Sequence, residues 1–236
     1  MSPNSSNARA RERAAAARAA QRRSERRRTV VRWTAIAGVV AVVAAGVVGL
    51  ALSNSGSSGS PASKTALGPE GIAIEPGTVL ASASSAASGQ TVDGIKCEST
   101  EQVAYHIHAH LAVFVNGHSR PIPLGIGVVS PQVSDGFAQA SHCYYWLHTH
   151  VQDGIIHIES PTKQTYTLKQ FFDEWQQPLT AAQVAGAKGA VTAYLNGTKV
   201  TGDPGKISLS SHADIQLDVG TPVVPPRTVD WSKSRL

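Results

Sequence analysis

Histidines are concentrated in one part of this chain, and imidazole is the side chain that most often ligates transition metals. Eight of the nine histidines lie between Tyr105 and Ser160. Six of these eight occur in three motifs, Tyr-His-Ile-His-Ala-His-Leu, Trp-Leu-His-Thr-His and Asp-Gly-Ile-Ile-His-Ile-Glu. Three alternating histidines followed by three more close together are an improbable coincidence on a solvated surface, so the motifs predict a metal site.

The first motif places histidine at alternate positions, at His106, His108 and His110. In an extended strand, alternate side chains share a face. We therefore expect a strand at residues 105–115 with three imidazoles on one face. The residues that alternate with them, from Tyr105 through Ile107, Ala109, Leu111 and Val113 to Val115, would face the core.

The other two motifs flank an Asp-Gly dipeptide at residues 153–154, which is a strong hairpin signal. If these two residues form a type I′ turn, His150 lies opposite His157 and His148 opposite Glu159, all on one face of the sheet. A three-residue loop would shift the register by one residue and divide the set between the two faces. The turn therefore decides whether the side chains meet.

Seven side chains are candidate metal ligands, namely His106, His108, His110, His148, His150, His157 and Glu159. Imidazole suits copper and zinc, and borderline metals also accept a carboxylate, so copper or zinc is the expected cofactor. Seven donors exceed the needs of one four-coordinate ion. Either some of them support the ligands, or two ions are bound.

Three functions are compatible with such a cluster. The first is binding, delivery or sensing of the metal. The second is a metal-dependent enzyme, in which three ligands leave a position for water or substrate, and Glu159 or a spare histidine serves as the general base. The third is a metal-free interaction module that responds to pH near the ordinary histidine pKa of about 6.5. The sequence identifies no other catalytic residue, since it has neither a Gly-x-Ser-x-Gly elbow nor a glycine-rich phosphate loop.

The only two cysteines are Cys97 and Cys143. An even number of cysteines in an exported domain favours a disulfide. The alternative is a pair of thiolate ligands for copper(I) or zinc, because Cys143 lies only five residues before His148.

The N-terminal third indicates export. Residues 1–32 contain ten arginines and two glutamates, while residues 33–52 carry no charge and would span about 30 Å as a helix, the thickness of a bilayer core. Arginines before the apolar stretch place the N-terminus in the cytoplasm. A cleavable signal peptide would give the same compartment, although the apolar stretch exceeds the usual length of its core. We expect a single-pass protein of the cell membrane whose main domain is extracytoplasmic, with no nucleic-acid partner and no protein partner that the sequence identifies.

Composition divides the chain into five expected segments. These are a basic cytoplasmic tail at 1–29, a transmembrane helix at 30–52, a flexible Ser/Gly/Ala linker at 53–92, a His-rich globular domain at 93–222 and a loose tail at 223–236. Within the linker, the apolar stretch at 71–80 could dock on the domain.

The expected fold class is α+β, composed mostly of antiparallel β-hairpins with one or two short helices. Asn-Gly pairs at 116–117 and 196–197 predict hairpin turns, and a loop is expected at 131–140. Thr167 and Gln170 form a capping box for a helix that ends before Pro178, and a second, shorter helix is expected from Thr180 to Gly186. Strands are expected at 190–195, 198–200, 206–209 and 215–219, an order that resembles a β-grasp in the C-terminal part.

The three histidine motifs, together with Val-Asp-Gly-Ile-x-Cys near residue 92 and Tyr-Thr-Leu-x-x-Phe-Phe near residue 166, resemble a family of uncharacterised, membrane-anchored or secreted prokaryotic proteins. The resemblance covers residues 92–220. It implies export and a shared domain, and it supplies no activity and no ligand assignment.

Overall fold

The computed structural model describes residues 66–236. These belong to a compact unit, Pro61–Leu236, one of two into which the chain divides. The predicted basic tail at 1–29 and transmembrane helix at 30–52 lie outside the described residues. From residue 66 to the C-terminus, no helix is long and apolar enough to cross a bilayer.

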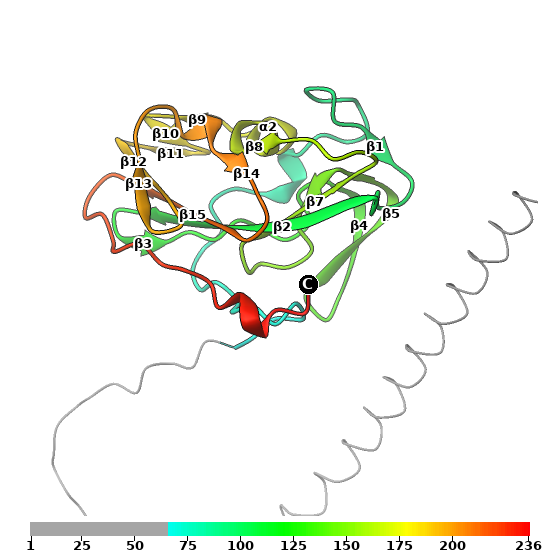
Figure 1. Ribbon diagram of the computed structural model, residues 1–236, viewed down its shortest axis with the longest axis horizontal. Coiled ribbons are helices and arrows are strands. Elements are labelled where there is room, and N and C mark those ends of the chain that lie inside the picture. The colour runs from blue at the N-terminus through cyan, green and yellow to red at the C-terminus, as the bar shows by residue number, and fades with distance from the viewer. Residues whose placement is uncertain (1–65) are drawn as a thin grey trace, which may run out of the picture. The chain divides into compact units, whose positions relative to one another are not determined.

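The largest sheet has seven strands and carries the histidine motifs (Figure 1). Its strands are β2 (Tyr105–Val115), β3 (His118–Ser119), β6 (Leu147–His148), β7 (Ile155–Ser160), β12 (Val191–Leu195), β13 (Thr198–Val200) and β15 (Ala213–Val219). Their order is β13-β12-β15-β2-β7-β6, and β3 pairs with β2. The central pair β15–β2 is parallel, and the other pairs of this sheet are antiparallel.

Two Asn-Gly turns confirm the predicted hairpins β2–β3 and β12–β13. Asn116 and Asn196 both have φ of 50°, and the glycine after each has φ of 78°. Positive φ at both central residues is the signature of a type I′ turn, whose twist matches that of the flanking strands. The sequence signal and the local geometry agree here because both central residues tolerate the left-handed region.

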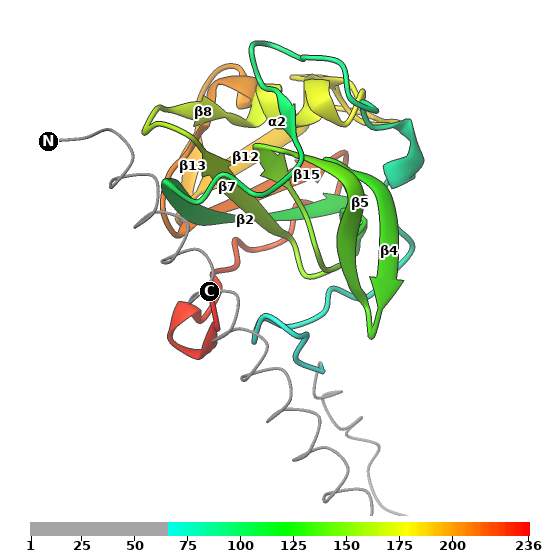
Figure 2. The same ribbon diagram turned by 90° about the vertical axis from the view of Figure 1, so that its right-hand side faces the viewer.

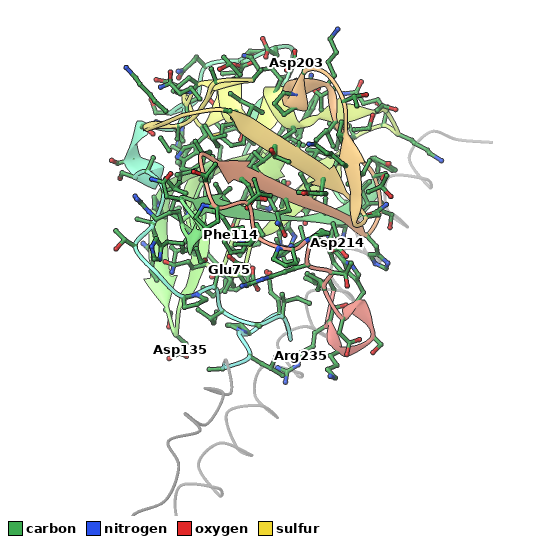
Figure 3. The ribbon with its side chains drawn as sticks, turned by 90° about the vertical axis from the view of Figure 1, so that its left-hand side faces the viewer. Glu75, Phe114, Asp135, Asp203, Asp214 and Arg235 are labelled. Atoms are coloured by element: carbon green, nitrogen blue, oxygen red, sulfur yellow. A yellow bond between two sulfur atoms is a disulfide. The ribbon has the colours of Figure 1, made fainter. Side chains whose placement is uncertain are left out.

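A second sheet, with strand order β1-β5-β4, lies beside the first (Figure 2). It consists of β1 (Cys97–Glu98), β4 (Val128–Ser134) and β5 (Phe137–Tyr145). The prediction of a loop at 131–140 is therefore wrong, because these residues belong to the β4–β5 hairpin. Asp135 and Gly136, at the tip of the β4–β5 hairpin, have φ of 53° and 76°, and the pairing shifts register at Pro131 (Figure 3). The bulge accommodates a proline, which cannot donate a ladder hydrogen bond.

One α-helix, α2 (Leu168–Glu174), is present in the described part of the chain. The predicted capping box of Thr167 and Gln170 begins it. The second predicted helix is wrong, because residues 179–188 form three very short strands, β9 (Leu179–Thr180), β10 (Gln183–Val184) and β11 (Ala187–Lys188). The Thr180 hydroxyl accepts the N–H of Ala182, and such local side-chain bonds compete with helix formation.

The remaining elements are short. They are the strands β8 (Tyr166–Thr167) and β14 (Ser208–Leu209), which pair with each other, and the 3-10 turns η1 (Ala83–Ser85), η2 (Pro204–Lys206) and η3 (Trp231–Lys233). The described residues are mostly β, with antiparallel sheets and one helix, so the expected α+β class is corrected to mainly β. The β-grasp likeness stays a prediction.

The core lies on the α2 side of the main sheet. It contains Ala109, Leu111 and Val113 of β2 and the aromatic side chains of α2 and its C-terminal cap, Phe171, Phe172 and Trp175. The alternate residues of β2 from Tyr105 to Val115 thus face the core, as predicted, and its histidines face the other side together with Ala112 and Phe114. Figures 1 and 2 show η3 on the side opposite α2.

Both segments that flank the predicted domain make contacts with it. Leu80 and Ala87, from the expected linker, belong to the core. In the expected loose tail, the Val229 N–H donates to the Asp214 carboxylate. The backbone N–H of Arg235 donates to the carbonyl of Glu70 at 2.8 Å, so the two segments also contact each other.

Candidate metal centre

Three adjacent strands bring the candidate ligands together. β7 lies between β2 and β6 in the sheet, so its side chains stand between those of its neighbours. His157 of β7 is opposite His108 of β2 and also opposite His148 of β6. Glu159 is opposite His106. Directly opposite residues have Cβ atoms about 5 Å apart, so the side chains on these strands are close enough to contact the same metal ion.

The hairpin register differs from the predicted one. His148, and not His150, is opposite His157, because residues 149–154 connect β6 to β7 as a longer loop. Gly154 has φ of 84°, but Asp153 is not in the left-handed region, and its carboxylate instead accepts the backbone N–H two residues on. The predicted type I′ turn at 153–154 is therefore wrong. A shift of two residues preserves the face of each side chain, so the histidines still meet.

The most buried group of donors is His148, His150 and His157, whose ring nitrogens lie within 4.8 Å of one another. Their relative exposures are 0%, 3% and 5%. Buried imidazoles are usually satisfied by hydrogen bonds to protein groups. The contacts of these three rings show which of their nitrogen atoms have a hydrogen-bond partner in the protein.

Backbone carbonyls fix the tautomers of two of these rings. His148 Nδ1 lies 2.9 Å from the Tyr145 carbonyl oxygen, and His150 Nδ1 lies 2.6 Å from that of Ala138. A carbonyl only accepts hydrogen bonds, so each Nδ1 carries the hydrogen and each neutral ring presents a lone pair at Nε2. These two Nε2 atoms face each other at 3.1 Å.

Burial, together with the neighbouring rings of His150 and His157, holds the pKa of His148 well below its ordinary value. In the neutral form of both rings, which the Nδ1 contacts orient, no hydrogen lies between the two Nε2 atoms. Such an arrangement is unfavourable unless a cation lies beside both nitrogens. It is the arrangement that a chelating pair of imidazoles requires.

His157 has a different environment, between two carboxylates. Its Nε2 lies 3.0 Å from Glu70 Oε1, and its Nδ1 lies 3.5 Å from Glu159 Oε1. Burial would lower the pKa of His157, but the contacts with Glu159 and Glu70 raise it to about 9. Burial would likewise raise the pKa of Glu159, but contacts with His106 and His157 hold it far below its ordinary value. A proton on His157 thus balances the charge of the buried carboxylates. A metal ion could replace the hydrogen on His157 Nδ1, while the hydrogen on His157 Nε2 stays bonded to Glu70.

A second group of donors, His106, His108 and His157, lies on the β2 side of His157. The Nε2 atoms of His106 and His108 are 2.9 Å apart, and His106 Nε2 is 3.0 Å from Glu159 Oε1. Burial and the neighbouring rings of His157 and His106 lower the pKa of His108 to about 3. The His106 side chain is 39% exposed, so this group opens to solvent.

Neither a family model, nor a curated protein, nor a solved structure matches this chain. The chemistry of the donors therefore carries the functional argument.

His110, a predicted ligand, does not join these groups. It lies 3.7 Å from Glu75 Oε1, and burial lowers its pKa to about 4. It lines a pocket of about 310 Å³ together with Arg227 and Glu75. Glu75 and Phe114 are labelled in Figure 3, and the Arg227 guanidinium lies 4.7 Å from the Phe114 ring centroid.

Two carboxylates at the site were not identified from the sequence. Glu101 Oε1 lies 3.4 Å from His150 Nε2, and Glu101 also groups with His148 and Glu159. Glu70 contacts His157 from the segment expected to be linker. A signal for Glu101 was available, because it follows Cys97 by four residues and a disulfide to Cys143 would hold it near β5.

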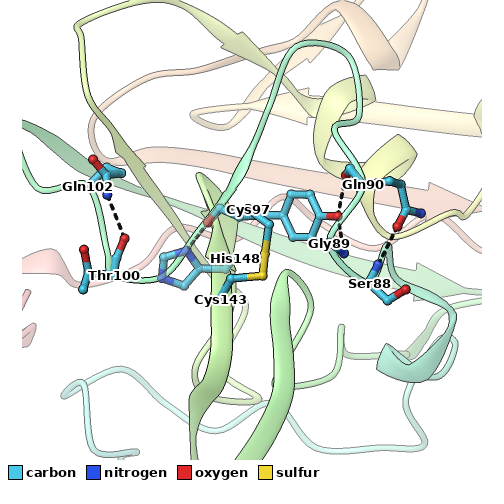
Figure 4. The surroundings of a disulfide bond; sticks show 9 residues. Ser88, Gly89, Gln90, Cys97, Thr100, Gln102, Cys143 and His148 are labelled. Atoms are coloured by element: carbon cyan, nitrogen blue, oxygen red, sulfur yellow. Dashed lines mark hydrogen bonds between the residues drawn. A yellow bond between two sulfur atoms is a disulfide. The ribbon is translucent and has the colours of Figure 1, made fainter.

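The predicted disulfide Cys97–Cys143 is present and joins β1 to β5 (Figure 4). The two sulfur atoms are therefore not thiolate ligands. The Tyr145 hydroxyl donates to the Gln90 carbonyl and accepts the N–H of Gly89, which ties a further segment to β5 (Figure 4). Together these contacts hold the chain before Glu101 against β5.

Proposed function

We propose that this protein is a membrane-anchored, extracytoplasmic metal-binding protein that holds copper or zinc through His148, His150 and His157. The observation that carries the proposal is the close approach of the Nε2 atoms of His148 and His150, which face each other at 3.1 Å in a buried setting. Backbone carbonyls orient both rings in advance, so binding an ion costs little reorganisation.

The donor set favours copper or zinc over hard cations. Three imidazoles suit either metal, whereas calcium and magnesium prefer oxygen ligands. A fourth position is available to Glu101, whose side chain is 37% exposed, or to water. An exchangeable fourth ligand at the solvent side is consistent with uptake and release of the ion.

Binding, delivery or sensing is favoured over catalysis by the position of the pocket. The pocket of about 310 Å³ is lined by His110 and Glu75, and none of the three proposed ligands lines it. A catalytic ion would need an open coordination position beside a substrate cavity. The proposed ligands lie instead beside Glu101, whose Oε1 is 3.4 Å from His150 Nε2.

Location outside the cytoplasm is part of the proposal. The Cys97–Cys143 disulfide supports it, because disulfides persist in oxidising compartments. The arginine-rich tail followed by twenty uncharged residues at 33–52 supports a retained single-pass anchor with its N-terminus in the cytoplasm.

The test is metal analysis of the full chain, purified in detergent, stripped with a chelator and reloaded with Zn²⁺ or Cu²⁺. We expect bound metal to survive gel filtration in the unmutated protein and to fall strongly in His148→Ala and His150→Ala. His118→Ala is the matched control, because His118 is exposed on β3 and outside the donor groups. Metal at background level in the unmutated protein would reject the proposal.

A further inference from the structure

We propose that the centre is dinuclear, with a second ion held by His106 and His108 and with the Glu159 carboxylate bridging the two ions. This inference rests on the proposed function for the first ion. It concerns donors that the first ion does not use.

The sheet separates the outer donors into two pairs. Neighbouring strands lie about 4.8 Å apart, so β2 and β6, on either side of β7, are separated by about twice that distance. Each three-histidine group takes its outer pair from one flanking region only, His106 and His108 from β2 or His148 and His150 from β6 and the loop after it. His157 of β7 belongs to both groups. The two groups therefore describe two positions and not one.

Donor number supports the same conclusion. The histidine groups contain five different imidazoles, and Glu101 and Glu159 add two carboxylates. A four-coordinate ion on the β6 side uses His148, His150 and His157 with one further donor. His106 and His108 remain, with their Nε2 atoms 2.9 Å apart, the same close approach as in the first pair.

Glu159 lies between the two positions. Its Oε1 is 3.0 Å from His106 Nε2, on the β2 side. The same residue groups with His148 and Glu101 on the β6 side. Its Oε2 is buried and has no hydrogen-bond partner. An orphaned buried carboxylate oxygen is costly, and a bridging carboxylate with one oxygen on each ion would satisfy both. Ions bridged in this way are typically about 3.5–4 Å apart.

The two positions differ in access to solvent. His106 is 39% exposed, whereas the rings of the first site are almost fully buried. The second ion is therefore reached by solvent at His106 and exchanges more readily, although His108 and Glu159 are buried. We expect the inner position to fill first and the outer one at higher metal concentration. Imidazole and carboxylate donors together favour Zn²⁺ or Cu²⁺ over copper(I).

The experiment is a titration of the chelator-stripped full chain in detergent with Zn²⁺, with bound zinc counted by mass spectrometry. Two ions per chain are expected in the unmutated protein and in His118→Ala. One ion is expected in the double variant His106→Ala/His108→Ala. Near-ultraviolet circular dichroism checks that the variant is folded.

A second measurement on the unmutated protein does not depend on any variant. Loading with Cu²⁺ should give a normal electron paramagnetic resonance signal at one equivalent. At two equivalents, the signal per copper should be broadened and reduced, because two ions bridged by a carboxylate couple magnetically. Two bound ions without coupling would overturn the bridge.

The outcomes separate the two proposals. A single ion in the unmutated protein, retained in His106→Ala/His108→Ala, overturns the dinuclear centre and leaves the proposed function intact. No ion at all overturns both.

Discussion

The carboxylate of Glu70 accepts a hydrogen bond from His157 Nε2 at 3.0 Å, across 87 positions in the chain. Glu70 is itself held by the C-terminal segment, since its carbonyl accepts the backbone N–H of Arg235. A carboxylate behind a ligating imidazole fixes the tautomer and raises the basicity of the ring. Glu70 is thus a positioning residue for His157, supplied by a segment whose composition suggested only a linker.

Replacing Glu70 by glutamine should therefore weaken metal binding without removing a ligand. We expect Glu70→Gln to lower the affinity for Zn²⁺ by roughly 10–100-fold. Competition with a chromophoric chelator measures the change. Glu98→Gln, the same substitution on β1, serves as the control and should bind as the unmutated protein does. An unchanged affinity in Glu70→Gln would show that Glu70 does not support the ligand.

Metal binding should also release a proton. The pKa of His157 is raised to about 9 in the metal-free protein, so the ring carries two hydrogens at pH 7.5. A metal at Nδ1 displaces one of them while Glu70 keeps the other. We expect about one proton per inner ion at pH 7.5 and none well above pH 9. Calorimetry in buffers of different ionisation enthalpy measures this number, and a value of zero at pH 7.5 would contradict the assigned ligand atom.

The face on which each histidine lies could be predicted from the sequence, but their cross-strand partners could not. Alternation fixes the face of His108 and His148 because the side-chain period of a strand is two. The pairing of His148 with His157 depends on the length of the connecting loop, and Asp153 uses its carboxylate to bond the backbone instead of adopting positive φ. The predicted register differs from the observed one by two residues. Because this is an even number, the histidines stay on the same face of the sheet and still meet.

The carboxylates at the site were harder to predict for a different reason. Glu70 and Glu101 lie outside the periodic segments, in chain whose conformation is set by distant contacts. The disulfide of Cys97 could be predicted from cysteine number and compartment and would place Glu101 near β5, but the contact of Glu101 with His150 could not be predicted. Local patterns locate residues on elements, whereas site residues supplied by loops require tertiary structure.

Gly154 should be intolerant of a side chain because of its contact with His110. A Cβ there would lie 2.6 Å from His110 Nε2 and 2.8 Å from the Leu111 carbonyl oxygen, and φ is +84°. Gly136 offers a matched control, with φ of +76° and no atom within 4 Å of its Cβ position. Gly136→Ala should cost about 1–2 kcal/mol for the left-handed backbone, and Gly154→Ala a further 1–3 kcal/mol, roughly, for overpacking. Urea denaturation measures both, and equal losses would contradict the steric argument.

The Cys97–Cys143 disulfide should contribute strongly to stability, because it spans a sequence separation of 46 residues. The loop-closure model gives about 4 kcal/mol for a loop of that length. We expect the double variant Cys97→Ser/Cys143→Ser to lose roughly this amount in urea denaturation. The unmutated protein measured in reductant should behave in the same way. A loss below about 1 kcal/mol in both cases would mean that other contacts, such as those of Tyr145, hold β1 in place without it.

Glu174 should make the stability of the domain depend on pH. It is fully buried on α2, neither carboxylate oxygen has a hydrogen-bond partner, and burial raises its pKa well above the ordinary value of 4.5. The folded state therefore keeps the proton to higher pH than the unfolded state does. The contribution of Glu174 to the free energy of unfolding is therefore fully present below pH 4.5. It falls by up to about 1.4 kcal/mol per pH unit as the pH rises from there towards the pKa of Glu174 in the folded state.

Glu174→Gln removes this ionisation while nearly preserving shape. We expect the variant to gain stability relative to the unmutated protein between pH 5 and pH 8, with a difference that grows with pH and is small at pH 4.5. Urea denaturation of the metal-free full chain across this range measures the difference. The metal is stripped first because metal and protons compete for the histidines, and this competition would add its own pH dependence. Glu98→Gln should show no such growth. A constant difference across the range would mean that Glu174 is ionised when the protein is folded, so that a cation or a solvent path reaches the carboxylate.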